Sequence, residues 1–174
     1  MKKVIVIAIL FLAAFQVDAQ RYCVVDSKYI LENLPEYKQA QTKLDEFSTN
    51  WQKEIDARLQ DVDRMYKSYQ AEQVMLSEEM KKSRENEIIK KEKEAKELQK
   101  KRFGFEGDLF KKRQELVKPV QDKVYNAVQK LAGSKGYDII FDKSADLSVF
   151  FADTKIDKSD DVLRDLGVTP SGKK

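Results

Sequence analysis

Residues 36–103 read EYKQAQTKLDEFSTNWQKEIDARLQDVDRMYKSYQAEQVMLSEEMKKSRENEIIKKEKEAKELQKKRF and contain no glycine or proline. Turns in compact folds use these two residue types, so 68 residues without either predict very long helix. At 1.5 Å per residue, one unbroken helix of this length would span roughly 100 Å. The predicted fold class is therefore mostly α, and we expect function to reside in a surface or a cavity rather than in a compact active site.

Apolar residues recur at intervals of three or four in the first part of this stretch, which is the spacing of a coiled coil. The pattern changes at 74–80, where Ser77 is a suitable N-cap and two acidic residues follow it. We therefore expect a long antiparallel coiled-coil hairpin with its tip near 74–80, a continuous rod being the alternative. Residues whose numbers sum to about 154 would then pair across the hairpin, which places Pro119 opposite Pro35. The expected seam consists of Leu44, Phe47, Trp51, Ile55, Leu59, Val62, Tyr66, Tyr69 and Leu76.

Four residues are candidate hinges of this arm, namely Pro35, Gly104, Gly107 and Pro119. Proline fits the first turn of a helix, as at position 35, but removes a hydrogen bond and kinks the helix inside it, as at 119. The two glycines cost a helix about 2 kcal/mol relative to alanine. They indicate either a soft point in the arm or a site of close helix approach, and alanine at both positions is expected to stiffen the arm.

Short elements flank the hairpin and are expected to form a small β body. Strands are predicted at 22–25, 137–142 and 147–152, a short helix up to about Asn33, and a terminal helix at 160–166. The expected domain organisation is a signal peptide at 1–19, body segments at 20–35 and 119–168, the arm at 36–118 and a flexible tail at 169–174.

The first residues have the composition of a secretory signal peptide. Two lysines precede an apolar run at 4–15, and small residues at Val17 and Ala19 predict a cut between Ala19 and Gln20. The apolar run is short for a membrane span, although an uncleaved anchor is the alternative. The expected location is the periplasm, after export across the inner membrane. Cys23 does not follow a lipoprotein cleavage pattern, and a single thiol makes no internal disulfide.

The composition argues against catalysis. The chain contains no histidine, which removes the usual general base and the commonest metal ligand. No phosphate-binding glycine loop, dinucleotide fingerprint or CxxC pair is present in the sequence. We therefore expect no enzyme activity, no cofactor and no metal.

Charge divides the arm into two halves. Residues 36–80 contain 6 basic and 10 acidic side chains, whereas 81–118 contain 14 basic and 8 acidic ones. Either the two halves attract each other within the hairpin, or the second half presents a basic stripe to anionic lipid headgroups or an acidic partner. Nucleic acid is not an expected partner, because the stripe lacks interleaved aromatic residues and the protein is exported. The basic stripe consists of Lys81, Lys82, Arg84, Lys90, Lys91, Lys93, Lys100, Lys101 and Arg102.

Methionine and aromatic residues gather toward the predicted tip. Methionine is adaptable and recurs on binding surfaces that accept many partners, although ordinary packing in the seam is the alternative, above all for the two tyrosines. The candidate binding residues are Met65, Tyr66, Tyr69, Met75, Leu76 and Met80.

The order of these parts resembles the OmpH/Skp family of periplasmic chaperones. The motifs that carry the resemblance are YCVVDS at 22–27, LVKPVQ at 116–121, GYDIIFD at 136–142 and DKSDDVLRDLG at 157–167. The resemblance covers essentially the whole mature chain, and Gly104 and Gly107 depart from a regular arm helix.

The resemblance implies a homotrimer in which strands of three chains form an oligomerisation body and three arms enclose a cavity. It further implies a holdase that binds unfolded outer-membrane β-barrel proteins without ATP; lipopolysaccharide or anionic lipid is a further candidate partner. A structural coiled-coil scaffold or spacer of the cell envelope is the alternative function. The candidate body residues are Val24, Ile139, Phe141, Val149 and Phe151.

Overall fold

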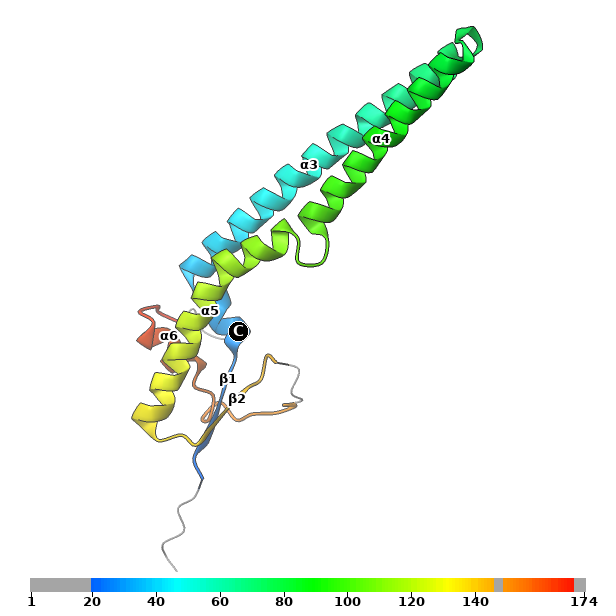
Figure 1. The fold of residues 1–174 in the computed structure, drawn as a ribbon. Coiled ribbons are helices and arrows are strands. Elements are labelled where there is room, and N and C mark those ends of the chain that lie inside the picture. The colour runs from blue at the N-terminus through cyan, green and yellow to red at the C-terminus, as the bar shows by residue number, and fades with distance from the viewer. Residues whose placement is uncertain (1–19, 146–148, 171–174) are drawn as a thin grey trace, which may run out of the picture. The chain divides into compact units, whose positions relative to one another are not determined.

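The structure is a computed structural model that describes residues 20–145 and 149–170 (Figure 1). The predicted signal peptide, residues 147 and 148 of a predicted strand, and the end of the predicted tail lie outside these residues. The described chain is mostly helical, with a long helical hairpin and one small sheet, so the predicted fold class is confirmed. It divides into two compact units, one formed by 31–123 and the other by the described parts of 1–30 and 124–174.

The first unit is an antiparallel hairpin. Helix α3 (Pro35–Glu72) and helix α4 (Glu78–Phe103) lie side by side, joined by the short helix η1 (Gln73–Met75) and two further residues (Figure 1). Ser77 is the N-cap of α4, and its Oγ accepts a hydrogen bond of 3.3 Å from the Met80 amide. The extended backbone of Leu76 (φ −87°, ψ 143°) interrupts the helix, and the cap and the two glutamates favour the start of α4, so the predicted reversal is confirmed.

The seam between the hairpin helices is tight in the middle and open toward the tip. Ile55 and Ala95 are each only 1% exposed, whereas Leu59 and Tyr66 are 41% and 49% exposed. Near the other end, Ala40, Leu44 and Val117 form a buried cluster. The distal part of the hairpin therefore buries little apolar surface, as the weakly apolar sequence of α4 predicts.

The two glycines lie in a loop that separates α4 from helix α5 (Asp108–Lys135). The Gly104 amide donates to the Lys100 carbonyl (2.8 Å) as the last bond of α4, and the Gly107 amide donates to the Gly104 carbonyl (2.9 Å) in a tight turn. Glu106 has a φ of 53°. The atoms nearest to a Cβ added at either glycine belong to residues 100–104, and the close helix approach stays a prediction.

The loop changes the pairing register of the hairpin. On its distal side, the hydroxyl of Tyr69 donates to Glu85, and Trp51 contacts Phe103, pairs whose numbers each sum to 154 as predicted. On its proximal side, Lys123 pairs with Glu36 at 2.6 Å, and this pair sums to 159. The sums differ because the loop residues take no part in the paired helices, which shifts the pairing by about one helical turn. Pro119, which lies inside α5, is consequently not opposite Pro35, and the prediction of both prolines at one level is wrong.

Arg102 connects the three helices at this break. Its Nη1 donates to Asp108 Oδ2 at 2.7 Å, and its Nη2 lies 3.4 Å from Glu54 Oε2. The guanidinium stacks on the Trp51 ring, 4.8 Å from its centroid. A planar cation with several donors suits such a junction, because it can bind two carboxylates and an aromatic face together.

The second unit contains a parallel two-stranded sheet. Strand β1 (Tyr22–Val25) pairs with β2 (Ile139–Asp142) in a register that sets Val24 beside Phe141. On its other side β1 meets the chain near Asp157, where the Val24 amide donates to the Ile156 carbonyl at 2.9 Å. Helix α2 (Ser27–Asn33) follows β1, and helix α6 (Ser159–Asp165) closes the unit. The buried residues of this unit include Cys23 of β1, Ile30 of α2, and Val162 and Leu163 of α6, each 0% exposed.

The predicted strand at 147–152 is wrong for its described residues. Residues 149–152 have no regular structure, and Phe150 and Phe151 are 97% and 84% exposed. A strand needs a partner backbone, and among the described residues β2 pairs with β1 alone, so residues 149–152 have not joined its other edge. Alternating apolar residues alone therefore do not make a strand here.

Candidate functional site

The tip of the hairpin presents apolar side chains to solvent. Val74 and Met75 in η1 are 86% and 79% exposed, and Met80 in the first turn of α4 is 52% exposed. The chain reverses here within a few residues, so no further turn of helix is available to cover these side chains. Two of the predicted binding residues, Met75 and Met80, thus lie together in an exposed apolar patch.

The remaining tip candidates are packed to different degrees. Tyr69 is half-buried, and its hydroxyl bonds the Glu85 carboxylate of α4. This hydrogen bond raises the pKa of Tyr69, with partial burial adding to the effect. Leu76 is also half-buried, whereas Tyr66 is about half exposed. Tyr69 therefore bridges the two helices, and Tyr66 keeps much of its ring available to a ligand.

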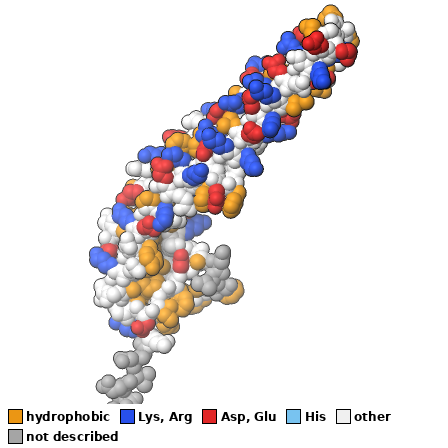
Figure 2. Space-filling view, in the orientation of Figure 1, with side chains coloured by type: hydrophobic (Ala, Val, Ile, Leu, Met, Phe, Trp, Pro, Cys, Tyr) orange, Lys and Arg blue, Asp and Glu red, His pale blue; other side chains and the backbone are white. Residues whose placement is uncertain are grey.

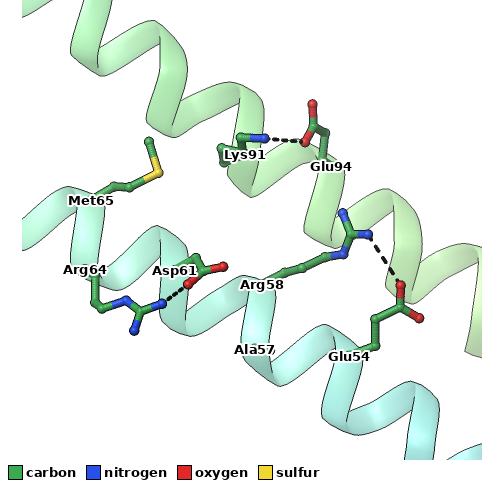
Figure 3. A pocket seen from close by; sticks show the side chains of 8 residues that line it. All are labelled: Glu54, Ala57, Arg58, Asp61, Arg64, Met65, Lys91 and Glu94. Carbon is green, nitrogen blue, oxygen red and sulfur yellow. Dashed lines mark hydrogen bonds and ion pairs between the residues drawn. The ribbon is translucent and has the colours of Figure 1, made fainter.

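A groove of about 610 Å³ lies farther along the hairpin. Figure 3 shows that α3 contributes most of its walls and that Met65 reaches from α3 toward α4. Met65 also lines a smaller cavity of about 100 Å³ nearer the tip, together with Tyr69 and Ile88. The lining of the groove comprises Glu54, Ala57, Arg58, Asp61, Arg64, Met65, Lys91 and Glu94.

The charges around the groove are paired along each helix. Arg58 lies 3.4 Å from Glu54, Lys91 lies 3.4 Å from Glu94, and Arg64 pairs with Asp61 (Figure 3). None of these three pairs joins α3 to α4. Exposed pairs of this kind stabilise a helix only slightly, by about 0.3–0.5 kcal/mol each. Glu54 also pairs with Arg102 of α4 at 3.4 Å, so opening the groove at this end would break that one contact between the helices.

About half of the basic stripe is neutralised by ion pairs in the structure. Lys81, Arg84, Lys91 and Lys93 pair with glutamates one turn away on α4, and Arg102 pairs with Glu54 and Asp108. The side chains of the other four make no ion pair with any residue of the described chain. These four are Lys82, Lys90, Lys100 and Lys101, and all are exposed.

The second unit carries its own exposed apolar surface around β2. Ile139 and Phe141 are 47% and 39% exposed, and a groove of about 680 Å³ is lined by Tyr22, Phe141 and the irregular segment 149–153. Val149 and Phe151, two candidate body residues, therefore flank the sheet without joining it. Val24 is only 3% exposed, although it also lines this groove, and its part in subunit contacts stays a prediction.

Sequence reasoning missed several exposed apolar side chains as candidates. Among them are Ile89 on α4 (60% exposed), Phe105 in the loop (99%) and Phe150 beside the sheet (97%). Phe105 lies between Gly104 and Gly107, and this signal was readable, because an aromatic residue between helix-breaking glycines has no regular seam to enter.

Other kinds of site are not evident among residues 20–145 and 149–170. Within these ranges no three acidic or cysteine side chains converge as a metal ion would require. No helix in the same ranges has the length and hydropathy needed to cross a bilayer. The exposed surfaces of the hairpin and of the sheet are therefore the features from which a function can be argued.

In the sequence, the helical hairpin lies between two strands that pair in parallel, β1 and β2. The chain belongs to the OmpH-like outer membrane protein family, whose model matches residues 21–166. Its fold is also that of a solved OmpH-like protein from Caulobacter crescentus CB15, a candidate outer membrane chaperone, with a TM-score of 0.70 at 13% identity. That match covers 86% of this chain and 85% of the other. A search of curated proteins gives no match.

Proposed function

We propose that this protein is a periplasmic holdase chaperone that binds unfolded outer-membrane β-barrel proteins without ATP and keeps them from aggregating. The observation that carries the proposal is the exposed apolar surface of the distal hairpin, above all Met75, Met80 and Tyr66. Membership of the OmpH-like family supports it, as does the chaperone description of the Caulobacter protein with the same fold.

The chemistry of the hairpin suits a client without fixed structure. Unfolded β-barrel proteins expose alternating apolar residues that aggregate in water. Methionine and tyrosine side chains adapt to many apolar shapes, and many weak contacts made at once give a high total affinity. The groove around Met65 adds apolar surface whose charged rim is already neutralised by its own ion pairs.

The cavity that holds a client would form between the arms of a homotrimer. Ile139, Phe141, Val149 and Phe151 are the side chains we propose for the contacts between subunits, because they leave apolar surface uncovered in one chain. Assembly would bury this surface, which a small body without much core needs.

A light-scattering assay tests the proposal. A β-barrel protein diluted from urea should scatter much less light when the chaperone is present at one trimer per client. Aggregation that is unchanged at this ratio would sink the holdase proposal and favour the alternative, a coiled-coil scaffold or spacer of the cell envelope, which predicts one fixed partner and no effect on scattering.

A variant pair locates the contact. Met75→Ser with Met80→Ser should raise the chaperone concentration needed for half-suppression by roughly tenfold, since two apolar contacts are lost. Tyr125→Ser is the matched control, because Tyr125 is 63% exposed but lies in the second unit. Equal effects of the two changes would remove the tip from the binding surface.

A further inference from the structure

The loop between α4 and α5 displays one aromatic side chain almost completely. Phe105 is 99% exposed, more than any other large apolar side chain of the described residues. Figure 2 shows hydrophobic side chains at the place where this loop leaves the hairpin in Figure 1. An exposed phenylalanine forgoes the free energy that its burial would supply, so a second conformation that buries the ring would gain stability.

A helical conformation of the loop would bring Phe105 onto the apolar face of α5. Phe105 precedes Leu109 by four residues, and residues four apart lie on the same face of a helix. Leu109 packs against the buried cluster that includes Leu44 and Val117. If α5 began one turn earlier, Phe105 would therefore extend the face that packs in the hairpin.

The pairing on the two sides of the loop shows what such a helix would require. Trp51 contacts Phe103 on the distal side, where paired numbers sum to 154, and Phe47 contacts Lys112 on the proximal side, where they sum to 159. One unbroken helix from α4 into α5 can keep only one of these registers. With the proximal register kept, α4 would slip along α3 by about one turn, or roughly 5 Å toward the tip.

The distal hairpin has few contacts that oppose this slip. The buried residues of α4 are Ile88 and Ala95, and both would exchange their neighbours on α3 for residues one turn farther along. The ion pairs among α4 residues lie within that helix and would move with it. The hydrogen bond from Tyr69 to Glu85 would be lost. At the tip, Gln73 already has helical dihedral angles (φ −54°, ψ −32°), so α3 can lengthen as α4 advances.

The loop conformation carries costs of its own. Glu106 holds a left-handed φ of 53°, which lowers the population of a non-glycine residue by roughly tenfold. Arg102 binds Asp108 and stacks on Trp51, but its Nε is buried and makes no hydrogen bond with the described residues. A buried donor without a partner weakens the junction that holds the loop in place.

The helical conformation has opposing terms of similar size. Gly104 and Gly107 together disfavour a helix by roughly 30-fold relative to alanine. Burial of Phe105 favours the helix by roughly 10- to 100-fold. Because these terms nearly cancel, the remaining contacts at the junction decide which conformation prevails.

We propose that residues 104–107 switch between this loop and a helix that joins α4 to α5, with α4 slipping about one turn along α3. The switch moves the tip outward by roughly 5 Å and removes Phe105 from solvent. A ligand that contacts the exposed ring favours the loop, which couples binding at this point to the reach of the arm. The switch is a property of the arm itself and does not rest on the holdase proposal.

Distances between spin labels test the switch on the full mature chain. Lys53→Cys on α3 and Lys82→Cys on α4 carry the labels, in a Cys23→Ala background diluted with unlabelled protein. The wild-type loop should give one main distance. Gly104→Ala with Gly107→Ala should give a distance longer by roughly 5 Å, because neither added Cβ fits the loop and alanine favours helix.

Two further variants separate the junction from the phenylalanine. Arg102→Met removes contacts that hold the loop, so the longer distance should also become populated. Adding Phe105→Ser should lower that population by roughly tenfold, since the helix then gains less from burial. Phe110→Ser is the matched control, because Phe110 is 46% exposed and helical in both conformations. This control should leave the populations unchanged.

A label pair within one helix controls for general loosening of the arm. Lys53→Cys with Gln70→Cys, both on α3, should keep one distance in every variant. The proposal is overturned if neither the alanine pair nor Arg102→Met gives the longer distance, or if a broad distribution replaces it. It is also overturned if the pair within α3 lengthens as well, or if Phe105→Ser changes the populations no more than Phe110→Ser does.

Discussion

Asp142, at the end of β2, organises the polar contacts around the start of α2. Its Oδ1 accepts hydrogen bonds from the Ser27 amide (3.1 Å), the Ser144 amide (3.0 Å) and the Ser144 hydroxyl (2.7 Å). Burial disfavours the charged form, but the hydrogen bonds from Ser27 and Ser144 outweigh it and hold the pKa of Asp142 below its usual range. The carboxylate therefore joins residues that are more than a hundred positions apart.

Replacing this carboxylate should make stability less dependent on acid pH. Asp142→Asn should lower the free energy of unfolding by about 1 kcal/mol at pH 7, because the hydrogen bonds lose their charge. Asp142 has a lower pKa folded than unfolded, so its contribution is present above the unfolded value of about 3.8 and is lost as the pH falls below it. Urea titrations of both proteins between pH 7 and pH 3 measure this difference.

The difference between the two proteins should narrow as the pH falls toward 3. Asp45→Asn is the control, since Asp45 is exposed and makes no hydrogen bond or ion pair with the described residues. A difference that stays constant across this range would show that charge at Asp142 is not what stabilises the sheet end.

Single residues were predictable where their chemistry acts locally. The N-cap at Ser77 and the first-turn proline at 35 depend on a few neighbouring residues, and both are confirmed. The roles of Asp142 and Arg102 were not predictable, because their partners lie far away in sequence and only the folded chain brings them together.

At the scale of elements, the break between α4 and α5 is set by its glycines. Sequence reasoning expected alanine at Gly104 and Gly107 to stiffen the arm. The structure leads to the opposite expectation, because a Cβ on Gly104 would meet the Lys100 carbonyl oxygen at 2.3 Å, a backbone atom that cannot move without breaking the end of α4. Alanine at Gly104 is therefore expected to disrupt the loop and not to stiffen the arm.

Gly104→Ala should lower the free energy of unfolding by about 1–3 kcal/mol. Gly133→Ala provides a matched control, since Gly133 lies inside α5 with no atom within 4 Å of its added Cβ. That change should stabilise the protein by about 0.5–1 kcal/mol, because alanine favours helix. Denaturant unfolding of the two variants measures both effects, and stabilisation by Gly104→Ala would contradict the loop conformation.

The helices were predictable from the sequence and their register was not. The heptad spacing and the absence of breakers are local patterns that predict α3 and α4 directly. The change in pairing from Tyr69–Glu85 to Glu36–Lys123 was not predictable, because a glycine pair does not reveal how many residues leave the helix. The strand expected at 147–152 failed for a similar reason, since pairing depends on a partner that is distant in sequence.

At the scale of the whole chain, the hairpin is an insertion between two paired strands. β1 and β2 are neighbours in the sheet, yet the entire hairpin separates them in sequence. A parallel pair requires such a long connection, and here the connection carries the proposed binding surface. If the hairpin binds clients as proposed, the sheet must hold together meanwhile, and the described residues supply it with two short strands.

Assembly through the exposed side of this sheet is the last prediction. Phe141 is 39% exposed on β2, and β1 is the one strand of the described chain that pairs with β2. Phe141→Asp would place a carboxylate in the proposed contact between subunits, which costs several kcal/mol per chain. Sedimentation equilibrium should show the wild type at about three times the mass of one chain and the variant at the mass of one chain. Ile89→Asp, which changes a 60% exposed residue of α4, should keep the wild-type mass. A Phe141→Asp protein that sediments with the wild type would place the subunit contact elsewhere, and a wild type that sediments as a single chain would remove the cavity on which the holdase mechanism depends.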